Sequence, residues 1–227
     1  MFDAAAVAEH VAEVRARIAA AGGHEVELVA VTKTFPVEAI RAAVAAGCRS
    51  IGENYAQELV AKAGALAAEG WAEGEQPEMH FIGHLQRNKV RMLAPVVTVW
   101  ETVDRAVIVD EIAQRAPGAR VFVQVNVSGE QQKHGCRPDE AAELVARAAG
   151  VGLRVEGLMT IGVMGDPDAA RAGFRGLRAL ATSLGLHGCS MGMSDDLEIA
   201  VEEGATHVRI GSALFGPRVR DGRRDLR

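Results

Sequence analysis

The stretch Glu27-Leu-Val-Ala-Val-Thr-Lys33 decides how this chain folds. Its apolar, β-branched residues run continuously instead of alternating with polar ones, which predicts a strand buried on both faces of a parallel sheet. Phe35 and Pro36 follow at once, and proline suits the first turn of a helix. Lys33 therefore occupies the turn between a strand and a helix, the edge at which strand–helix repeat folds carry their chemistry.

A lysine in this turn has two interpretations. Next to Val31 and Phe35 its amine would be partly desolvated, and desolvation lowers the pKa of a lysine and frees the neutral, nucleophilic amine. In that case Lys33 is expected to form a Schiff base with a carbonyl compound. The alternative is a lysine at a strand end that points into water, and this stretch by itself favours that alternative.

The alternation of apolar runs and amphipathic segments continues along the chain. We expect strands at residues 27–32, 49–53, 79–82, 96–100, 120–126, 153–159, 188–191 and 206–210. We expect helices at 36–46, 55–69, 86–93, 104–115, 138–149, 167–184 and 194–203, and a helical turn near 215. This α/β pattern predicts a parallel sheet with right-handed crossovers, and eight units close into a barrel. An open doubly wound sheet is the alternative, but no GxGxxG motif follows the first strand.

We therefore predict a single (β/α)8 TIM-type barrel domain spanning residues 1–227. An extra N-terminal helix at 3–21, within the segment 1–22, precedes the repeat. Its apolar face consists of Val7, Val11, Val14 and Ile18. At the other end, residues 218–227 form a basic tail, which we expect to be solvated; a docking tail is the alternative.

Composition excludes several classes of protein. The formal net charge of −5 does not favour nucleic-acid binding. Cys48, Cys136 and Cys189 show no CxxC spacing, which indicates a reducing compartment and neither a disulfide framework nor a zinc site. The sequence has no signal-peptide pattern and no apolar run long enough to span a bilayer. We expect a cytoplasmic protein without a membrane partner.

The carboxyl ends of the strands of a barrel meet at one face, so residues that are far apart in the sequence converge there. Read in chain order, these ends supply Lys33, Asn54, His84, Asn126, Met159, Ser194, Arg209, Gly211 and Ser212. Barrels often bind phosphate at the last two loops. Ser194 opens a predicted helix, and glycine at 211 lets backbone amides approach a ligand closely. The two loops together predict a phosphate site, although Ser194 could equally be an ordinary N-cap.

Arg209 points to the same side of its strand as Gly211. A buried arginine needs a partner, either a ring nitrogen or anion of a ligand, or an inward acid such as Glu53 or Glu156. An imine-forming lysine, a phosphate site and an arginine beside a ring nitrogen together describe a pyridoxal 5′-phosphate site. Arginine only donates hydrogen bonds, so the ring nitrogen would stay unprotonated and the ring would be a weak electron sink.

Other candidate sites are weaker. His80 and His84 are four residues apart, but they straddle a strand end, where this spacing does not put them on one face, so we expect no metal site. Residues 128–135 form a loop that is either a lid or a plain connection. No GxSxG, Walker or HExxH motif is present.

Several segments of this chain resemble the pyridoxal phosphate homeostasis proteins, and the resemblance runs from about residue 28 to residue 218. These segments are 30–33, 52–58, 80–89, 125–130, 157–161, 190–194, 208–212 and 215–216. The resemblance implies a barrel like the alanine racemase N-terminal domain, with pyridoxal 5′-phosphate on Lys33. It further implies Ser194, Gly211 and Ser212 at the phosphate, Arg209 at the pyridine nitrogen, and Asn54 and His84 beside the cofactor. Met79 departs from the tryptophan that is usual in the family.

By resemblance, the protein binds, stores and delivers the cofactor in vitamin B6 homeostasis, with apo pyridoxal-phosphate enzymes as transient partners, and has no established catalysis. We also expect a monomer. Alanine racemases carry a second domain that supplies a tyrosine base, whereas Tyr55 is the only tyrosine here. Two alternatives stay open. One is a racemase-like enzyme of low activity with His84 as second base, and the other is a barrel that binds another phosphorylated metabolite with Lys33 unmodified.

Overall fold

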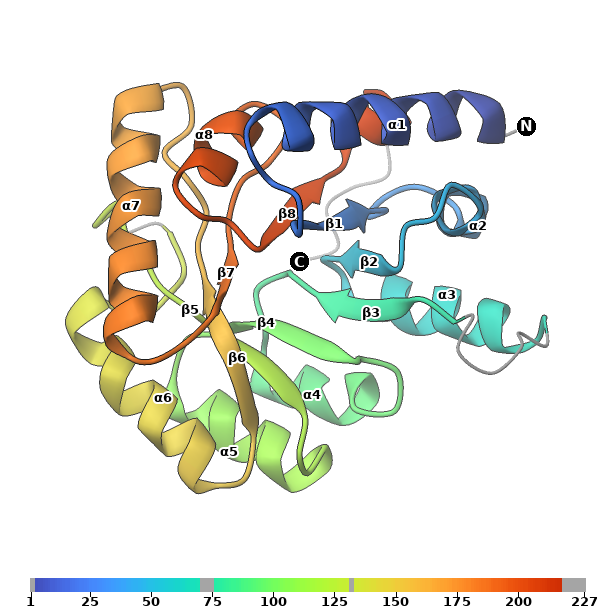
Figure 1. Ribbon diagram of the computed structural model, residues 1–227. Coiled ribbons are helices and arrows are strands. Elements are labelled where there is room, and N and C mark those ends of the chain that lie inside the picture. Colours follow the sequence, from blue (N-terminus) through green and yellow to red (C-terminus); the bar gives the residue numbers. More distant parts are fainter. Residues whose placement is uncertain (1–2, 70–75, 131–132, 218–227) are drawn as a thin grey trace.

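The computed structural model describes residues 3–69, 76–130 and 133–217, in which parallel strands form a closed barrel in chain order from β1 to β8. The strands are β1 (Glu27–Val31), β2 (Ser50–Glu53), β3 (Glu78–Phe81), β4 (Val99–Val103), β5 (Arg120–Gln124), β6 (Arg154–Met159), β7 (Gly188–Ser190) and β8 (His207–Ile210). β8 pairs with β1 and closes the ring (Figure 1). The predicted barrel is confirmed, and the open-sheet alternative is wrong.

One strand lies away from its predicted position. The valines at 96 and 97 indicated a strand at 96–100, but their amides both bond to the carbonyl of Leu93 and form the turn after the preceding helix. Strand pairing starts at Thr98, whose amide bonds to the carbonyl of Met79. β4 therefore runs three residues further and includes Glu101.

The helices lie outside the ring of strands, as Figure 1 shows. They are α1 (Ala4–Ala20), α2 (Val37–Ala45), α3 (Ala56–Ala67), α4 (Arg87–Leu93), α5 (Ala106–Arg115), α6 (Ala141–Gly150), α7 (Pro167–Ser183), α8 (Leu197–Glu202) and α9 (Ser212–Phe215). A 3-10 turn, η1 (Pro138–Glu140), precedes α6. The predicted helix at 194–203 is wrong at its start, because α8 begins three residues later, after Asp196 as N-cap.

The extra N-terminal helix has a defined structural role. The helix after β8, α9, has only four residues, and α1 contacts α2, α8 and α9 over the outside of β1 and β8 (Figure 1). The predicted face of Val7, Val11, Val14 and Ile18 is buried in this contact. α1 therefore covers the sector of the barrel that a full eighth helix would cover.

Most of the apolar core lies between strands and helices, while the inside of the barrel holds both apolar and polar side chains. Val99, Phe122 and Met159 form a small separate apolar cluster, and Val29, Val31 and Ile82 meet around Gly52. The buried polar residues include His80, Glu101, Gln124, Ser190 and Arg209.

Among the described residues, no helix is long and apolar enough to cross a membrane. The predicted basic tail at 218–227 lies outside the described residues.

Candidate functional site

Lys33 lies in a tight turn directly after β1. Thr32 is fully buried and Lys33 is half-buried. The amide of Phe35 bonds to the carbonyl of Thr32, and Thr34 has a φ of 68°, the left-handed region that a β-branched residue rarely adopts. The turn is thus held in a conformation that the isolated sequence would not favour, and it presents Lys33 at the mouth of the barrel.

A second lysine holds this turn from behind. Lys62 on α3, whose side chain is 7% exposed, donates to the carbonyl of Thr32 at 2.7 Å and pairs with Glu53 at 2.5 Å and Glu58 at 2.7 Å. Glu58 in turn accepts the amide of Thr34 at 2.7 Å. The backbone is therefore fixed on both sides of Lys33 by one network of charged groups.

The same network corrects an expectation about Glu53. Burial raises the pKa of Glu53, while Lys62 and the hydroxyl of Thr32, which donates at 2.6 Å, oppose this rise. Because its partner Lys62 lies on α3, Glu53 faces the helix layer. The alternative in which Glu53 is an inward acid and the partner of Arg209 is therefore wrong.

Asn54 and His84 lie at the ends of neighbouring strands β2 and β3. Asn54 is half-buried, and its buried Oδ1 atom has no hydrogen-bond partner among the described residues. Gly83 packs directly on the backbone of Asn54, since a Cβ at Gly83 would lie 2.0 Å from the Asn54 carbonyl oxygen. The close approach that glycine permits brings the chain just before His84 against the backbone of Asn54.

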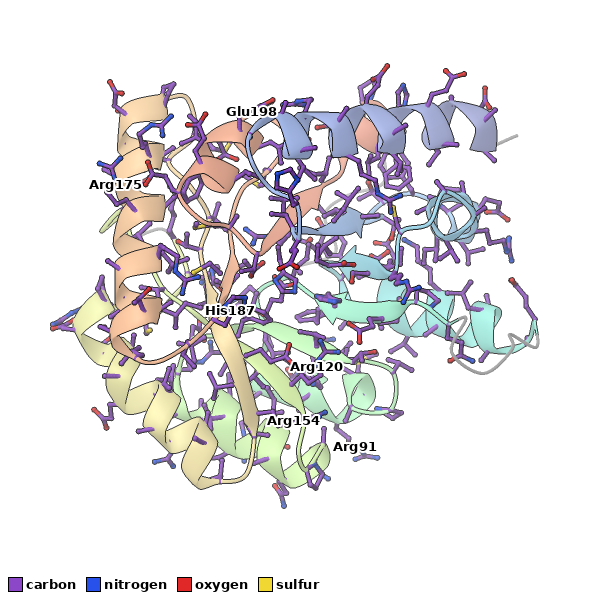
Figure 2. All side chains as sticks on the ribbon, viewed as in Figure 1. Arg91, Arg120, Arg154, Arg175, His187 and Glu198 are labelled. Atoms are coloured by element: carbon purple, nitrogen blue, oxygen red, sulfur yellow. The ribbon has the colours of Figure 1, made fainter. Side chains whose placement is uncertain are left out.

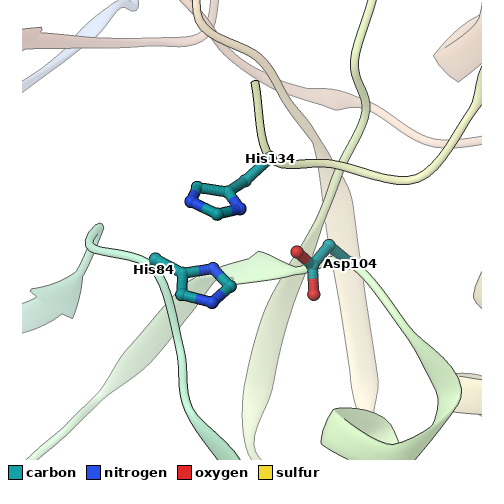
Figure 3. Close-up of side chains that lie close together, drawn as sticks. All are labelled: His84, Asp104 and His134. Carbon is teal, nitrogen blue, oxygen red and sulfur yellow. The ribbon is translucent and has the colours of Figure 1, made fainter. Parts of the chain in front are cut away.

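His84 is exposed at the mouth and stacks on His134, with ring centroids 3.8 Å apart (Figure 3). Burial by neighbouring atoms lowers the pKa of His84, and the adjacent His134 lowers it further. His80, in contrast, is buried inside the barrel. The expectation that His80 and His84 do not share a face is therefore confirmed.

Arg209 is buried inside the barrel, as predicted, but its acidic partner differs from both acids considered. Its guanidinium donates to the hydroxyl of Ser190 and to the carbonyl of Thr160, each at 2.6 Å, and lies 3.9 Å from Glu101. Glu156 instead pairs with Arg120 at the opposite, amino-terminal ends of the strands. Burial lowers the pKa of Arg209, and Glu101 opposes this shift, so the group remains a cation.

Glu101 links Arg209 to a buried histidine. It accepts hydrogen bonds from His80 Nδ1 and from the Ser190 hydroxyl, both at 2.6 Å. Burial favours the neutral form of each partner, but the contacts with Glu101 and Glu78 raise the pKa of His80 to about 9. Burial alone would raise the pKa of Glu101, but the contacts with His80, Arg209 and Ser190 lower it to about 2. The chain His80–Glu101–Ser190–Arg209 is therefore charged at neutral pH.

The two turns predicted to bind phosphate lie side by side. The hydroxyl of Ser212 donates to that of Ser194 at 3.1 Å, and the amide of Ala213 lies 3.4 Å from the same Ser194 oxygen. Ser194 is not the N-cap of α8, which was one of its two interpretations; Asp196 takes that position. Asp196 also accepts the amide of Met193 at 2.6 Å, so this amide is already used.

The two serine-bearing turns, at Ser194 and at Ser212, adjoin the Lys33 turn. A Cβ at Gly211 would lie 3.3 Å from the carbonyl oxygen of Val31, and the rings of Phe35 and Phe215 are 5.3 Å apart. α1 braces the arrangement from outside, because Arg17 donates to the carbonyl of Ser194 at 3.2 Å and pairs with Glu198 at 2.6 Å. Figure 2 shows Glu198 on α8 beside α1.

Met159 and the loop after β5 complete the mouth. Met159 ends β6 and is fully buried with Val99 and Phe122 inside the barrel. A cavity of about 210 Å³ lies above the ends of β5 and β6, lined by Val125, Asn126, Lys133, His134, Thr160 and Ile161. Asn126, before the loop at 128–135, donates through its side chain to the carbonyls of Glu130 and Lys133. Residues 131 and 132 of this loop lie outside the described residues.

Sequence reasoning missed four residues of this mouth: Lys62, Glu101, Asp104 and His134. The spacing of Glu58 and Lys62 is a visible i,i+4 pair, but such pairs are usually exposed. Glu101 fell outside the predicted strand. Asp104 and His134 join His84 only through tertiary structure, for which one sequence carries no signal.

Comparison with known proteins shows consistent similarity. The family model of the alanine racemase N-terminal domain matches residues 2–219. The pyridoxal phosphate homeostasis protein of Pseudomonas aeruginosa is 44% identical over 93% of this chain and 96% of its own length. PipY of Synechococcus elongatus, solved with PLP bound, is 30% identical with a TM-score of 0.80, over 92% of this chain and all of PipY. Alanine racemase from Corynebacterium glutamicum, at 19% identity and a TM-score of 0.69 over 98% of this chain and 63% of its own, shares the fold.

Proposed function

This chain belongs to the pyridoxal phosphate homeostasis protein family, and from that premise we propose that it binds pyridoxal 5′-phosphate at the barrel mouth, as a Schiff base on Lys33. When bound, the cofactor supplies an aldehyde that a lysine amine can capture. The protein then holds and delivers the cofactor in intracellular vitamin B6 homeostasis.

One observation carries the proposal: the Lys33 turn and the two serine-bearing turns are contiguous. Gly211 packs against Val31, two residues before Lys33, and Ser212 bonds to Ser194 at 3.1 Å. The turn that carries the Lys33 amine thus lies beside a patch of hydroxyls and backbone amides. This pairing fits a molecule with an aldehyde near one end and a phosphate at the other.

The remaining residues have distinct roles in the proposal. Arg209, fixed by Ser190 and Thr160, donates toward the pyridine nitrogen. Asn54 has an unsatisfied buried oxygen that a ligand group can satisfy, and His84 follows Gly83, which packs on the Asn54 backbone. Met159 supplies part of the apolar floor beneath the mouth.

We infer a carrier and not an enzyme. An arginine donor leaves the ring nitrogen unprotonated, which weakens the stabilisation of a carbanion. The Pseudomonas aeruginosa relative, which is 44% identical, is named for homeostasis and not for a reaction, which supports the same inference. The protein acts as a cytoplasmic monomer that meets apo pyridoxal-phosphate enzymes transiently, and its three buried free cysteines suit a reducing compartment.

The absorption spectrum of the purified protein tests the proposal. The wild type should show an imine band that borohydride removes, and Lys33→Ala should fold normally and lack the band. Lys133→Ala is a matched control, because it removes another lysine amine at the mouth, from the loop after β5. A full-strength, borohydride-sensitive imine in Lys33→Ala would refute the role of Lys33.

A further inference from the structure

Three strand-end loops bring two imidazoles and a carboxylate together at one edge of the mouth. His84 follows β3, Asp104 follows β4 and His134 lies in the loop after β5 (Figure 3). One ligand atom from each lies within 4.8 Å of the others, and both histidines are exposed. We propose that His84, Asp104 and His134 form a binding site for a divalent transition-metal ion of the zinc type. This proposal does not rest on the proposed cofactor function.

The donor set determines the class of ion. Imidazole nitrogen suits zinc, copper, iron and nickel, whereas calcium and magnesium prefer oxygen ligands alone. Two histidines and one carboxylate also leave coordination positions for water or a ligand, unlike the closed site of a structural zinc. The site is therefore suited to an exchangeable ion at the surface of the mouth.

The geometry requires only a small closure. Zinc ligand distances of about 2.0–2.1 Å put the ligand atoms of a tetrahedral site about 3.3 Å apart. Compared with the 4.8 Å limit of the cluster, the separations between the ligand atoms need to shrink by at most about 1.5 Å. The parallel rings of His84 and His134 must also turn so that their lone pairs converge, and exposed imidazoles rotate readily.

The backbone beneath the three ligands is firmly held. Thr102 donates to the carbonyl of Gly83 at 2.6 Å, just before His84. Gln124 donates to the carbonyl of His134 at 3.1 Å, which ties the loop to β5. Arg105 pairs with Asp104 Oδ1, and the carboxylate offers its second oxygen to a metal. Since Arg105 adds a positive charge beside the site, we expect moderate affinity.

Zinc titration by calorimetry, with untagged protein freed of metal by chelation, tests the site. We expect one zinc ion per chain, with binding weakened at least tenfold in His84→Ala, His134→Ala and Asp104→Asn. His24→Ala is the matched control, because His24 is also exposed but lies outside the cluster, and it should bind zinc as the wild type does. Circular dichroism should be unchanged in all four variants.

Two results would overturn the proposal. One is equal zinc binding by the wild type, His84→Ala and His134→Ala. The other is loss of zinc binding in Lys33→Ala, which would assign the ion to the lysine side of the mouth. Unchanged zinc binding in Lys33→Ala, together with loss of its imine band, would show that the two sites are separate.

Discussion

Lys62 donates a 2.7 Å hydrogen bond to the carbonyl oxygen of Thr32, the residue before Lys33. The bond joins the buried ammonium of Lys62 on α3 to the backbone that presents Lys33 at the mouth. Glu58, which pairs with Lys62, accepts the amide of Thr34 on the other side. Because Thr34 is in the left-handed region, a conformation that costs about 1–3 kcal/mol, these contacts are needed to hold the turn.

We predict that Glu58→Ala folds but retains the cofactor less well. The variant removes the acceptor of the Thr34 amide, so the Lys33 turn can relax out of its strained conformation. The loss of one hydrogen bond to a charged acceptor, worth about 1.5–3 kcal/mol, should reduce cofactor retention by at least tenfold. The imine band after gel filtration measures retention.

Two further variants are compared with Glu58→Ala: one breaks the same network and the other is a control outside it. Lys62→Met should cost about 3–5 kcal/mol of folding free energy, because it leaves the Glu53 charge buried without its cation. Glu38→Ala removes an exposed acid that pairs with Arg41 and should change neither stability nor retention. If Glu58→Ala retained the cofactor like Glu38→Ala, the turn would not depend on the network.

The buried pair of His80 and Glu101 should make folding stability depend on pH. The pKa of His80 is raised from 6.5 to about 9 in the folded protein. A raised histidine pKa adds stability that is fully present below pH 6.5 and is lost as the pH rises through 9. The pKa of Glu101 is lowered from 4.5 to about 2, so its contribution is present above pH 4.5 and is lost as the pH falls toward 2.

Urea unfolding of wild type and His80→Gln between pH 6 and pH 10 measures this effect. The difference between the two unfolding free energies should be largest near pH 6 and should shrink by an amount on the order of 3 kcal/mol by pH 10. His187→Gln, which changes an exposed histidine, is the control for the substitution itself. A constant difference between wild type and His80→Gln would mean that folding does not raise the pKa of His80.

Ser194→Ala should weaken retention of the phosphorylated cofactor by roughly two- to twelvefold, because one neutral hydrogen bond is worth about 0.5–1.5 kcal/mol. Pyridoxal, which lacks the phosphate, should be retained poorly by the wild type and should not distinguish it from Ser194→Ala. Ser183→Ala, at the exposed end of α7, is the control. Equal retention of both forms of the vitamin by the wild type would show that the serine-bearing turns do not bind phosphate.

The barrel could be predicted from sequence because each unit repeats the same local physics. Continuous apolar runs mark strands buried on both faces, and amphipathic segments mark their covering helices. The predicted position of β4 was wrong because the apolar residues Val96 and Val97 lie in the turn before the strand, whereas the strand itself contains Glu101 and Thr102. Polar side chains inside the barrel interrupt the apolar pattern, and the acid that neutralises Arg209 was missed for this reason.

Residues at strand ends were predictable as a group, but their partners were not. Strand order alone brings Lys33, Ser194 and Ser212 to one face. The orientation of Lys62, in contrast, depends on how α3 packs over β2, since an i,i+4 pair with Glu58 exists whether it faces water or the barrel. The stacking of His84 on His134 likewise depends on loop geometry.

The last prediction separates a carrier from a racemase. Arg209 is held by Ser190, Thr160 and Glu101. In the proposed complex it would donate to the ring nitrogen, and it cannot itself accept a proton. A racemase also needs an acid or base on the face opposite the lysine. The only tyrosine, Tyr55, is 52% exposed, and the imidazole of His84 stacks on His134.

Holo protein mixed with an apo pyridoxal-phosphate enzyme should therefore restore part of the activity of that enzyme. Incubated with alanine or serine in deuterated water, the same holo protein should exchange the α-hydrogen no faster than free cofactor does. Lys33→Ala, which lacks the imine, should deliver no cofactor and is the control for carry-over. Rapid, stereospecific exchange that disappears in Lys33→Ala would instead establish catalysis, because only a base positioned by the protein removes the α-hydrogen from one face.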